Sequence, residues 1–194
     1  MTEFYIVRHG QTLFNVLKRV QGWCDSPLTE EGIEQAKHLN KTMKDLHFDA
    51  AFCSTQERAI DSIHYILAGR DIEIRYLKGL KEVYFGDLEG EVAADIFKTG
   101  KEYPYGFKEA GGENIEQAID RYLTTLKEIA HEYPEGKIFI ISHGTMLTRL
   151  LRKMVPEFSS RKGDVGALVP NCSLTKINYD GEFEVEYYSD TRYL

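Results

Sequence analysis

The sequence has few cysteines and no long apolar run, and each shortage excludes a class of protein. Its three cysteines, Cys24, Cys53 and Cys172, are odd in number, widely spaced and form no CxxC pair. This argues against a disulfide framework and against a zinc site, and it favours a reducing compartment. No stretch approaches the roughly 20 apolar residues of a membrane-spanning helix. Since a strand begins within a few residues of Met1, no signal peptide is expected, and we predict a cytoplasmic protein.

Positive charge is also in deficit. Lysine and arginine total 24 against 31 aspartate and glutamate residues, which gives a formal net charge of -7. This balance disfavours nucleic acid and anionic membrane as partners, so any bound anion must be held by a local cluster of cations. The length of 194 residues, with 42% hydrophobic and 28% charged content, predicts a single globular domain over 1–194.

Short apolar runs alternate with amphipathic segments along the chain. Strands are predicted at 4–7, 49–53, 72–77, 137–141, 173–179 and 182–188, the last two joined by the turn Asp180-Gly181. Helices are predicted from the Thr29 cap to Leu46, from a capping box at Ser54–Glu57 to residue 67 or 68, and over 113–133 and 145–155. The alternation predicts an α/β three-layer sandwich, with a mainly parallel sheet between helices and a C-terminal antiparallel hairpin at one edge. Residues 83–112 form an irregular, glycine-rich insertion.

Two of the predicted strands end in the same dipeptide. Phe4–Val7 is followed by Arg8, His9 and Gly10, and the strand at 137–141 is followed by Ser142, His143 and Gly144. Open α/β sheets bind ligands beyond the carboxyl ends of their strands, so both histidines are expected in one cleft. A turn at His9, which Gly10 permits, brings Arg8 to the same cleft. A single His-Gly is more often a satisfied turn, but two at matching strand ends favour a site.

A further cation stands where a helix disfavours it. Arg58 falls in the first turn of the predicted helix that begins near Ser54, where the helix dipole opposes positive charge. Arg8, Arg58, His9 and His143 together suit a phosphoryl anion, because guanidinium forks match its oxygens. The free amides that open the helix after Gly144 add further donors. A neutral imidazole is a suitable nucleophile, and the proton donor is left open among Glu82, Asp87 and Glu89.

The motifs of the chain resemble, in order, those of the histidine phosphatase superfamily in its phosphoglycerate mutase-like branch. The resemblance covers nearly the whole chain. It rests on Arg8-His9-Gly10-Gln11-Thr12 with Asn15, Gln21-Gly22, Asp25, Pro27-Leu28-Thr29, Gly32, Ser54, Arg58-Ala59, Leu80, Glu82, Gly86, Glu89-Gly90, Gly111-Gly112-Glu113, Ser142-His143-Gly144 and Asn171-Cys172-Ser173. One departure is Ser62, where many members carry threonine; the change is conservative and is not expected to disturb the site.

The resemblance implies a role for each site residue. His9 is the nucleophile that becomes a phosphohistidine, and Glu82 protonates the leaving oxygen and then activates water. The phosphoryl oxygens are held by Arg8, Arg58 and His143, with a hydrogen bond from Asn15, and Gln21 lines the site. The family needs no metal, and no cofactor is expected. The implied substrate is a small phosphorylated metabolite.

The length of the chain separates two versions of this chemistry. Phosphoglycerate mutases of the family are usually longer between the acid and the third motif block, and residues 83–112 are short for that segment. A phosphatase is therefore predicted over a cofactor-dependent mutase; a non-catalytic phosphoryl-binding module is the third reading. The substrate and the oligomeric state stay open. Basic and aromatic residues near the leaving-group side are Lys81, Tyr84, Phe85, Lys98, Lys101, Tyr103, Tyr105 and Phe107.

Overall fold

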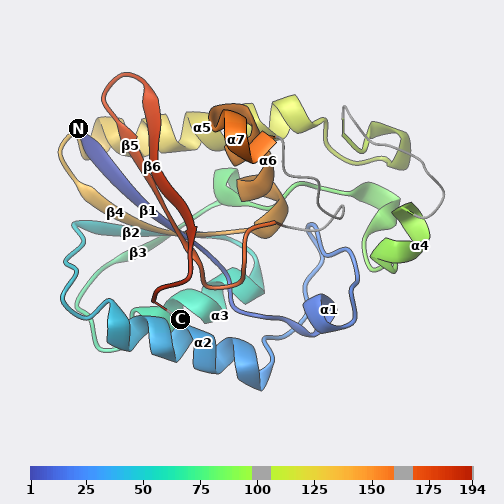
Figure 1. The fold of residues 1–194 in the computed structure, drawn as a ribbon, viewed down its shortest axis with the longest axis horizontal. Coiled ribbons are helices and arrows are strands. Elements are labelled where there is room, and N and C mark those ends of the chain that lie inside the picture. Colours follow the sequence, from blue (N-terminus) through green and yellow to red (C-terminus); the bar gives the residue numbers. More distant parts are fainter. Residues whose placement is uncertain (98–105, 160–167, 194) are drawn as a thin grey trace.

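A computed structural model describes residues 1–97, 106–159 and 168–193, and a six-stranded sheet runs through its centre (Figure 1). The strands are β1 Thr2–Arg8, β2 Ala50–Ser54, β3 Ile74–Leu77, β4 Lys137–Ser142, β5 Leu174–Tyr179 and β6 Phe183–Asp190. Their order in the sheet is β3-β2-β4-β1-β5-β6. The first four are parallel, whereas β5 and β6 form an antiparallel hairpin beside β1. The predicted fold class is confirmed.

Helices cover both faces of the sheet, and the strand residues alternate between two cores. Phe4 and Ile6 pack with α5 (Ile115–Glu132) and α6 (Gly144–Met154) on one face. Tyr5 and Val7 pack with α2 (Glu30–Thr42) and α3 (Glu57–Ile66), which cover the other face. Burial of each Val, Leu or Ile side chain contributes about 1.5–3 kcal/mol to the stability of the fold. Because β1 and β4 are covered on both faces, their central residues are all apolar instead of alternating with polar ones.

Two helices depart from the prediction at an end where a residue distant in sequence binds the backbone. Helix α2 begins as predicted, with Thr29 Oγ1 accepting a bond from the Gly32 amide at 3.0 Å, but it ends at Thr42 rather than Leu46. Arg70 binds the carbonyl oxygens of Met43 and Leu46 beyond that end. Helix α3 begins at Glu57, and Gln56 precedes it without a side-chain cap, so the capping box predicted at Ser54 is absent.

The irregular parts of the chain hold only short helices. They are α1 Leu13–Val16, α4 Ala93–Phe97, α7 Pro156–Ser159, and the 3-10 turns Lys78–Leu80, Gly86–Leu88 and Lys108–Ala110. The insertion at 83–112 therefore contains two 3-10 turns and α4 among its described residues. None of the described helices is both long and apolar enough to cross a membrane.

The register of β1 against β4 positions the two histidines. Arg8 lies opposite Ser142 in this parallel pair, so His9 and His143 leave the same edge of the sheet side by side. The position after His9 requires glycine because of close packing, not because the backbone is left-handed there. A Cβ at Gly10 would lie 2.6 Å from the carbonyl oxygen of Gly32, inside any normal contact.

Candidate active site

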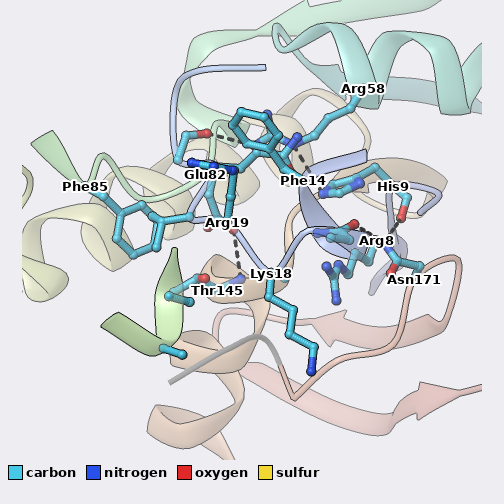
Figure 2. Close-up of a pocket in the computed structure, with 17 residues that line it drawn as sticks. Arg8, His9, Phe14, Lys18, Arg19, Arg58, Glu82, Phe85, Thr145 and Asn171 are labelled. Atoms are coloured by element: carbon cyan, nitrogen blue, oxygen red, sulfur yellow. Dashed lines mark hydrogen bonds between the residues drawn. The ribbon is translucent and has the colours of Figure 1, made fainter. Parts of the chain in front are cut away.

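A cavity of about 530 Å³ opens beyond the carboxyl ends of the parallel strands (Figure 2). Seven of the eight predicted site residues line it, namely Arg8, His9, Asn15, Gln21, Arg58, Glu82 and Gly144. The eighth, His143, is fully buried beside the cavity, with its ring centroid 5.4 Å from that of His9. The structure therefore brings all eight residues to one place from chain segments that are far apart.

The His9 ring has one nitrogen bound and one available. Its Nδ1 lies 2.8 Å from the carbonyl oxygen of Gly10, to which it donates, so the lone pair is on Nε2. Arg58 Nε donates to that Nε2 at 3.3 Å. Burial, followed by the charges of Arg58 and Arg8, lowers the pKa of His9 well below its ordinary value. The imidazole is consequently neutral near pH 7 and presents an unprotonated nitrogen to the cavity.

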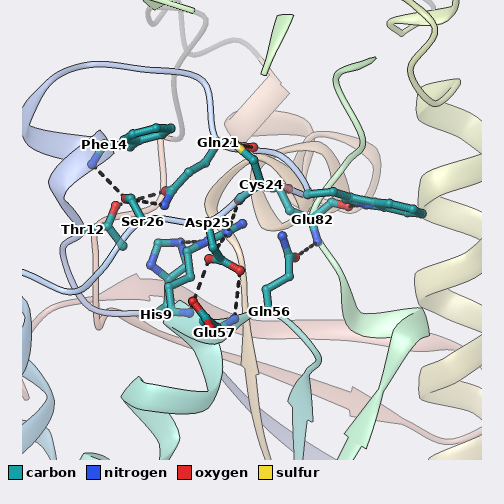
Figure 3. A network of polar contacts seen from close by, with 12 residues as sticks. His9, Thr12, Phe14, Gln21, Cys24, Asp25, Ser26, Gln56, Glu57 and Glu82 are labelled. Carbon is teal, nitrogen blue, oxygen red and sulfur yellow. Dashed lines mark hydrogen bonds and ion pairs between the residues drawn. The ribbon is translucent and has the colours of Figure 1, made fainter. Parts of the chain in front are cut away.

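Arg58 lies against the dipole of its own helix because a carboxylate from a distant loop compensates it. Asp25 Oδ1 accepts a bond from Arg58 Nη1 at 2.6 Å. Asp25 Oδ2 accepts the Glu57 amide at 2.9 Å, and Figure 3 shows these two residues side by side. Arg58 also donates to the carbonyl oxygens of Gly22 and Cys24. Asp25 thus replaces the missing cap of α3 and fixes the guanidinium beside His9.

A second carboxylate holds the loop that supplies those carbonyls. Glu89 accepts bonds from the amides of Trp23 and Cys24, both at 2.7 Å, and from the amide of Phe85 at 3.1 Å. Both Glu89 oxygens are therefore occupied by backbone donors. Of the three acids left open by the sequence, Asp87 is exposed and only Glu82 lines the cavity.

The Glu82 carboxylate lies at the start of α6. Its Oε2 accepts the Thr145 amide at 2.9 Å, and its Oε1 accepts the amides of Met146 at 2.7 Å and Val83 at 2.9 Å. The sequence predicted that the amides opening this helix are free to bind an anion. That prediction is wrong for Thr145 and Met146, whose amides donate to Glu82. Arg121 of α5 reinforces the position by donating to the Glu82 carbonyl oxygen at 3.3 Å.

Arg8 is held from the far end of the chain. Its Nη1 donates to the carbonyl oxygen of Val169 at 2.7 Å, and burial lowers its pKa to about 10, so the side chain stays charged at pH 7. Asn171 Nδ2 donates to His9 O at 2.9 Å and to Asn15 Oδ1 at 3.1 Å. Asn15 Oδ1 also accepts the Thr12 amide, so both of these contacts use the side-chain oxygen. Asn15 lines the cavity, and its Nδ2 has no hydrogen-bond acceptor among the described residues.

The His143 ring is bound at one nitrogen and unpartnered at the other. Its Nε2 lies 2.7 Å from Ser54 Oγ, whereas the buried Nδ1 has no hydrogen-bond partner among the described residues. Burial, then the charge of Arg58, lowers the pKa of His143 well below its ordinary value. Ser54 Oγ in turn lies 3.4 Å from Gln56 Oε1, which accepts the Glu82 amide at 2.8 Å. A chain of side chains therefore links His143 to the backbone of Glu82.

Gln21 is fixed by its neighbours while it lines the cavity. Its Oε1 accepts a bond from Thr12 Oγ1 at 3.1 Å, and its Nε2 donates to Ser26 Oγ at 2.9 Å (Figure 3). Of the candidates for the leaving-group side, Phe85 lines the cavity, and Lys81, Tyr84 and Phe107 do not. Lys98, Lys101, Tyr103 and Tyr105 lie outside the described residues.

Several supporting residues have roles that the sequence did not predict. Asp25 and Asn171 stood in the quoted motifs, which was the only signal available for them, whereas Ser54 was expected to cap a helix and Glu89 was a candidate proton donor. Gln56 gave no signal at all. Ser62, expected to be neutral, accepts the Gly10 amide at 2.9 Å and donates to the Arg58 carbonyl oxygen at 2.6 Å, so it ties α3 to the turn after His9.

The described residues show no group of three or more His, Cys, Asp or Glu side chains arranged to hold a metal ion. The groups that face the cavity are instead cationic side chains, a neutral imidazole and one carboxylate. This donor set fits an anion with a transferable proton or phosphoryl group.

Comparison with known proteins places the chain among phosphoryl-handling enzymes. The family model described as "Histidine phosphatase superfamily (branch 1)" matches residues 4–191. The uncharacterized phosphatase PhoE of Bacillus subtilis (strain 168) is 30% identical, over 94% of this chain and 91% of that protein. A 2,3-bisphosphoglycerate-dependent phosphoglycerate mutase of Cytophaga hutchinsonii is 33% identical, over 78% of each chain. The crystal structure of a phosphoglycerate mutase from Bacillus anthracis str. Sterne aligns with a TM-score of 0.84 at 29% identity, covering 99% of this chain and 94% of that one.

Proposed function

Since this chain belongs to the histidine phosphatase superfamily (branch 1), we propose that it hydrolyses a small phosphomonoester through a phosphohistidine on His9, without a metal ion. The observation that carries the proposal is the state of the His9 ring. Its Nδ1 is committed to Gly10, its pKa is depressed, and its Nε2 lone pair faces a cavity that holds two guanidinium groups. A nucleophile, charge stabilisation and a carboxyl group therefore occupy one site.

In the first half of the reaction, Nε2 of His9 attacks the phosphorus atom. The phosphorus–nitrogen bond forms while the bond from phosphorus to the ester oxygen breaks. Arg58 Nε turns from His9 to a phosphoryl oxygen, and Arg8 and Asn15 donate to the others. Glu82, protonated at the start of this step, gives its proton to the leaving oxygen, and the product alcohol departs. Each charge-assisted hydrogen bond contributes about 1.5–3 kcal/mol to holding the anion.

In the second half, water replaces the alcohol. Glu82, now a carboxylate, takes a proton from the water as its oxygen attacks phosphorus and the phosphorus–nitrogen bond breaks. The site is returned to its starting state with inorganic phosphate as the second product. Glu82 is positioned for both roles, since three backbone amides fix its carboxylate at the cavity wall.

A mutase is the second candidate, because relatives of both kinds match the chain. A mutase retains the phosphoryl group on histidine and returns it to a second substrate, and it needs priming by a bisphosphorylated cofactor. The short insertion at 83–112 supports the phosphatase. Stimulation of phosphoglycerate interconversion by 2,3-bisphosphoglycerate, with little release of phosphate, would favour the mutase instead.

The test is a screen of phosphorylated metabolites after treatment with a chelator, using wild type, His9→Ala and His38→Ala. His38 is an exposed histidine on α2, so its variant is a matched control. We expect phosphate release by wild type and His38→Ala, and none by His9→Ala. Rapid quenching with labelled substrate should trap phosphate in an acid-labile, alkali-stable bond in the two active proteins. Equal turnover by His9→Ala, or activity abolished by the chelator, would refute the proposal. Binding without turnover by wild type would favour the non-catalytic module.

We further propose a cytoplasmic location. Cys24, Cys53 and Cys172 are all free in the structure, which supports a reducing compartment. Fractionation of cells that express a tagged chain tests this location.

A further inference from the structure

The cavity contains more positive charge than one phosphoryl group requires. Besides Arg8 and Arg58, the lining includes Lys18 and Arg19, and Glu82 is the one acidic side chain among the described residues that line it. The chain as a whole carries a net charge of -7. A local excess of cations against the overall sign marks a place where an anion gains from binding.

The backbone of Lys18 and Arg19 is fastened to the insertion on the other side of the cavity. The Ala93 amide donates to the Lys18 carbonyl oxygen, and the Val20 amide donates to that of Glu91, both at 2.9 Å. Arg19 forms an isolated antiparallel bridge with Val92. Lys18 itself adopts a left-handed backbone with a φ of 53°, which is uncommon for a residue with a side chain. Both cations are therefore presented from a fixed segment rather than from a loose loop.

Their side chains lie at the mouth of the cavity and have free donors. Both residues are exposed, in contrast to Arg8 and Arg58 at its base. No hydrogen bond or ion pair joins the Lys18 ammonium to any described residue. Arg19 uses Nη1 for the carbonyl oxygen of Gly90 and keeps its other donors. Figure 2 shows the Lys18 side chain extending away from Arg58.

Apolar side chains also line the cavity, namely those of Phe14, Val20, Phe85 and Ala93. Carbon atoms of a leaving group would contact this surface, because apolar walls with a few placed polar groups are typical of small-molecule sites. The cavity thus combines two buried guanidinium groups, apolar side chains and two exposed cations.

We infer that Lys18 and Arg19 form a second anion subsite, and that the leaving group of the preferred substrate carries a carboxylate or a second phosphate there. This inference rests on the proposed function and deepens it by naming the substrate class. If Lys18 and Arg19 were merely solvated surface cations, the protein would not discriminate between substrates that differ only in the charge of the leaving group, at the end away from the phosphoryl group. A subsite would give such a preference, and salt would weaken it, because exposed charges are screened.

The experiment uses one three-carbon skeleton with three different ends. Glycerol 3-phosphate ends in a hydroxymethyl group, 3-phosphoglycerate in a carboxylate, and glycerol 1,3-bisphosphate in a phosphate. The proteins compared are wild type, Lys18→Gln, the double variant Lys18→Gln/Arg19→Gln, and Lys41→Gln as an exposed lysine of α2 outside the cavity lining. Activity toward glycerol 3-phosphate reports the proposed function alone, and kcat/KM ratios among the three esters report the subsite.

In wild type and Lys41→Gln, we expect kcat/KM for at least one doubly anionic ester to exceed that for glycerol 3-phosphate by about tenfold. The double variant should lose this preference and keep its activity on glycerol 3-phosphate within about twofold, with Lys18→Gln intermediate. The ester that shows the preference distinguishes carboxylate from phosphate. Calorimetric binding of the three esters to His9→Ala measures the same preference without turnover. Hydrolysis of all three esters with no preference, or a preference that survives in the double variant, overturns the subsite while the proposed function stands.

Discussion

The carboxylate of Asp25 binds Arg58 at 2.6 Å and, through its other oxygen, accepts the amide that opens the helix on which Arg58 stands. One side chain therefore supplies both the helix cap and the counter-charge. This explains how a cation is tolerated in the first turn of α3. It also couples the stability of α3 to the orientation of the guanidinium beside His9.

Replacing Asp25 by asparagine should therefore affect stability and activity together. We expect the free energy of unfolding to fall by about 1.5–3 kcal/mol, because buried Arg58 loses its charged hydrogen-bond partner. We expect kcat/KM to fall by about 10²-fold, since a misplaced guanidinium no longer matches the phosphoryl oxygens. Urea unfolding and steady-state kinetics measure the two effects. Asp61→Asn, an exposed aspartate on the same helix, should leave both unchanged. An active Asp25→Asn protein would show that Arg58 is oriented by its carbonyl contacts alone.

Glu82→Gln should slow hydrolysis most for esters with poor leaving groups. The amide lacks a transferable proton, and general acid–base catalysis contributes about 10²–10⁴-fold. We expect a loss of that size for an alkyl phosphate, and a much smaller loss in the burst of p-nitrophenolate from p-nitrophenyl phosphate, whose leaving group needs no acid. Stopped-flow measurement of the burst, beside steady-state rates, separates the two halves of the reaction. Equal losses for both esters in the burst phase would argue that Glu82 is not the proton donor.

Ser54 is expected to set the tautomer of His143. Its hydroxyl proton has two acceptors in reach, His143 Nε2 at 2.7 Å and Gln56 Oε1 at 3.4 Å, and the shorter contact is the stronger. Donation to Nε2 leaves the ring proton on Nδ1, ready for a substrate oxygen. In Ser54→Ala we expect kcat/KM to fall about tenfold, the equivalent of one hydrogen bond of about 1–1.5 kcal/mol. Nitrogen NMR shifts of His143 should change from the Nδ1-protonated form to a mixture. Unchanged shifts would assign Ser54 a packing role only.

The two buried histidines predict a pH dependence of stability. The pKa values of His9 and His143 lie well below the ordinary value, because of burial and the nearby arginines. As the pH falls below about 6.5, the unfolded chain takes up protons that the folded chain does not. The free energy of unfolding should then decrease by up to about 1.4 kcal/mol per pH unit for each histidine, until the folded pKa is reached.

Urea unfolding between pH 8 and pH 5.5 measures how the free energy of unfolding changes with pH. In this range ordinary carboxyl groups do not titrate, so they do not contribute to the slope. His9→Gln should remove one of the two contributions. A slope unaffected by His9→Gln would mean that His9 is already protonated in the folded protein at these pH values.

The sequence predicted the pairing of His9 with His143 because it follows from local pattern and sheet geometry. Two apolar runs that end in His-Gly must meet if their strands are parallel neighbours, and the register Arg8 opposite Ser142 shows that they are. The layers and the C-terminal hairpin followed from the same periodicities. The expectation of a single domain over 1–194 stays a prediction.

What the sequence could not predict depends on contacts between distant segments. Glu82, Asp87 and Glu89 are chemically alike and lie within eight residues of one another, so the residues alone did not decide which of them faces the cavity. That choice is made by the amides at the start of α6 and by the loop amides that occupy Glu89. The predicted start of α3 was wrong for the same reason, because the helix is capped by the carboxylate of distant Asp25 rather than by the Ser54 hydroxyl.

The contacts that close the site also determine when it can first exist. Arg8 is held by Val169, and His9 by Asn171, so the last part of the chain completes what the first part begins. A nascent chain that stops before Val169 therefore lacks the partners of both residues. Assembly of the site accordingly depends on contacts that are synthesised more than 150 residues after the side chains they hold.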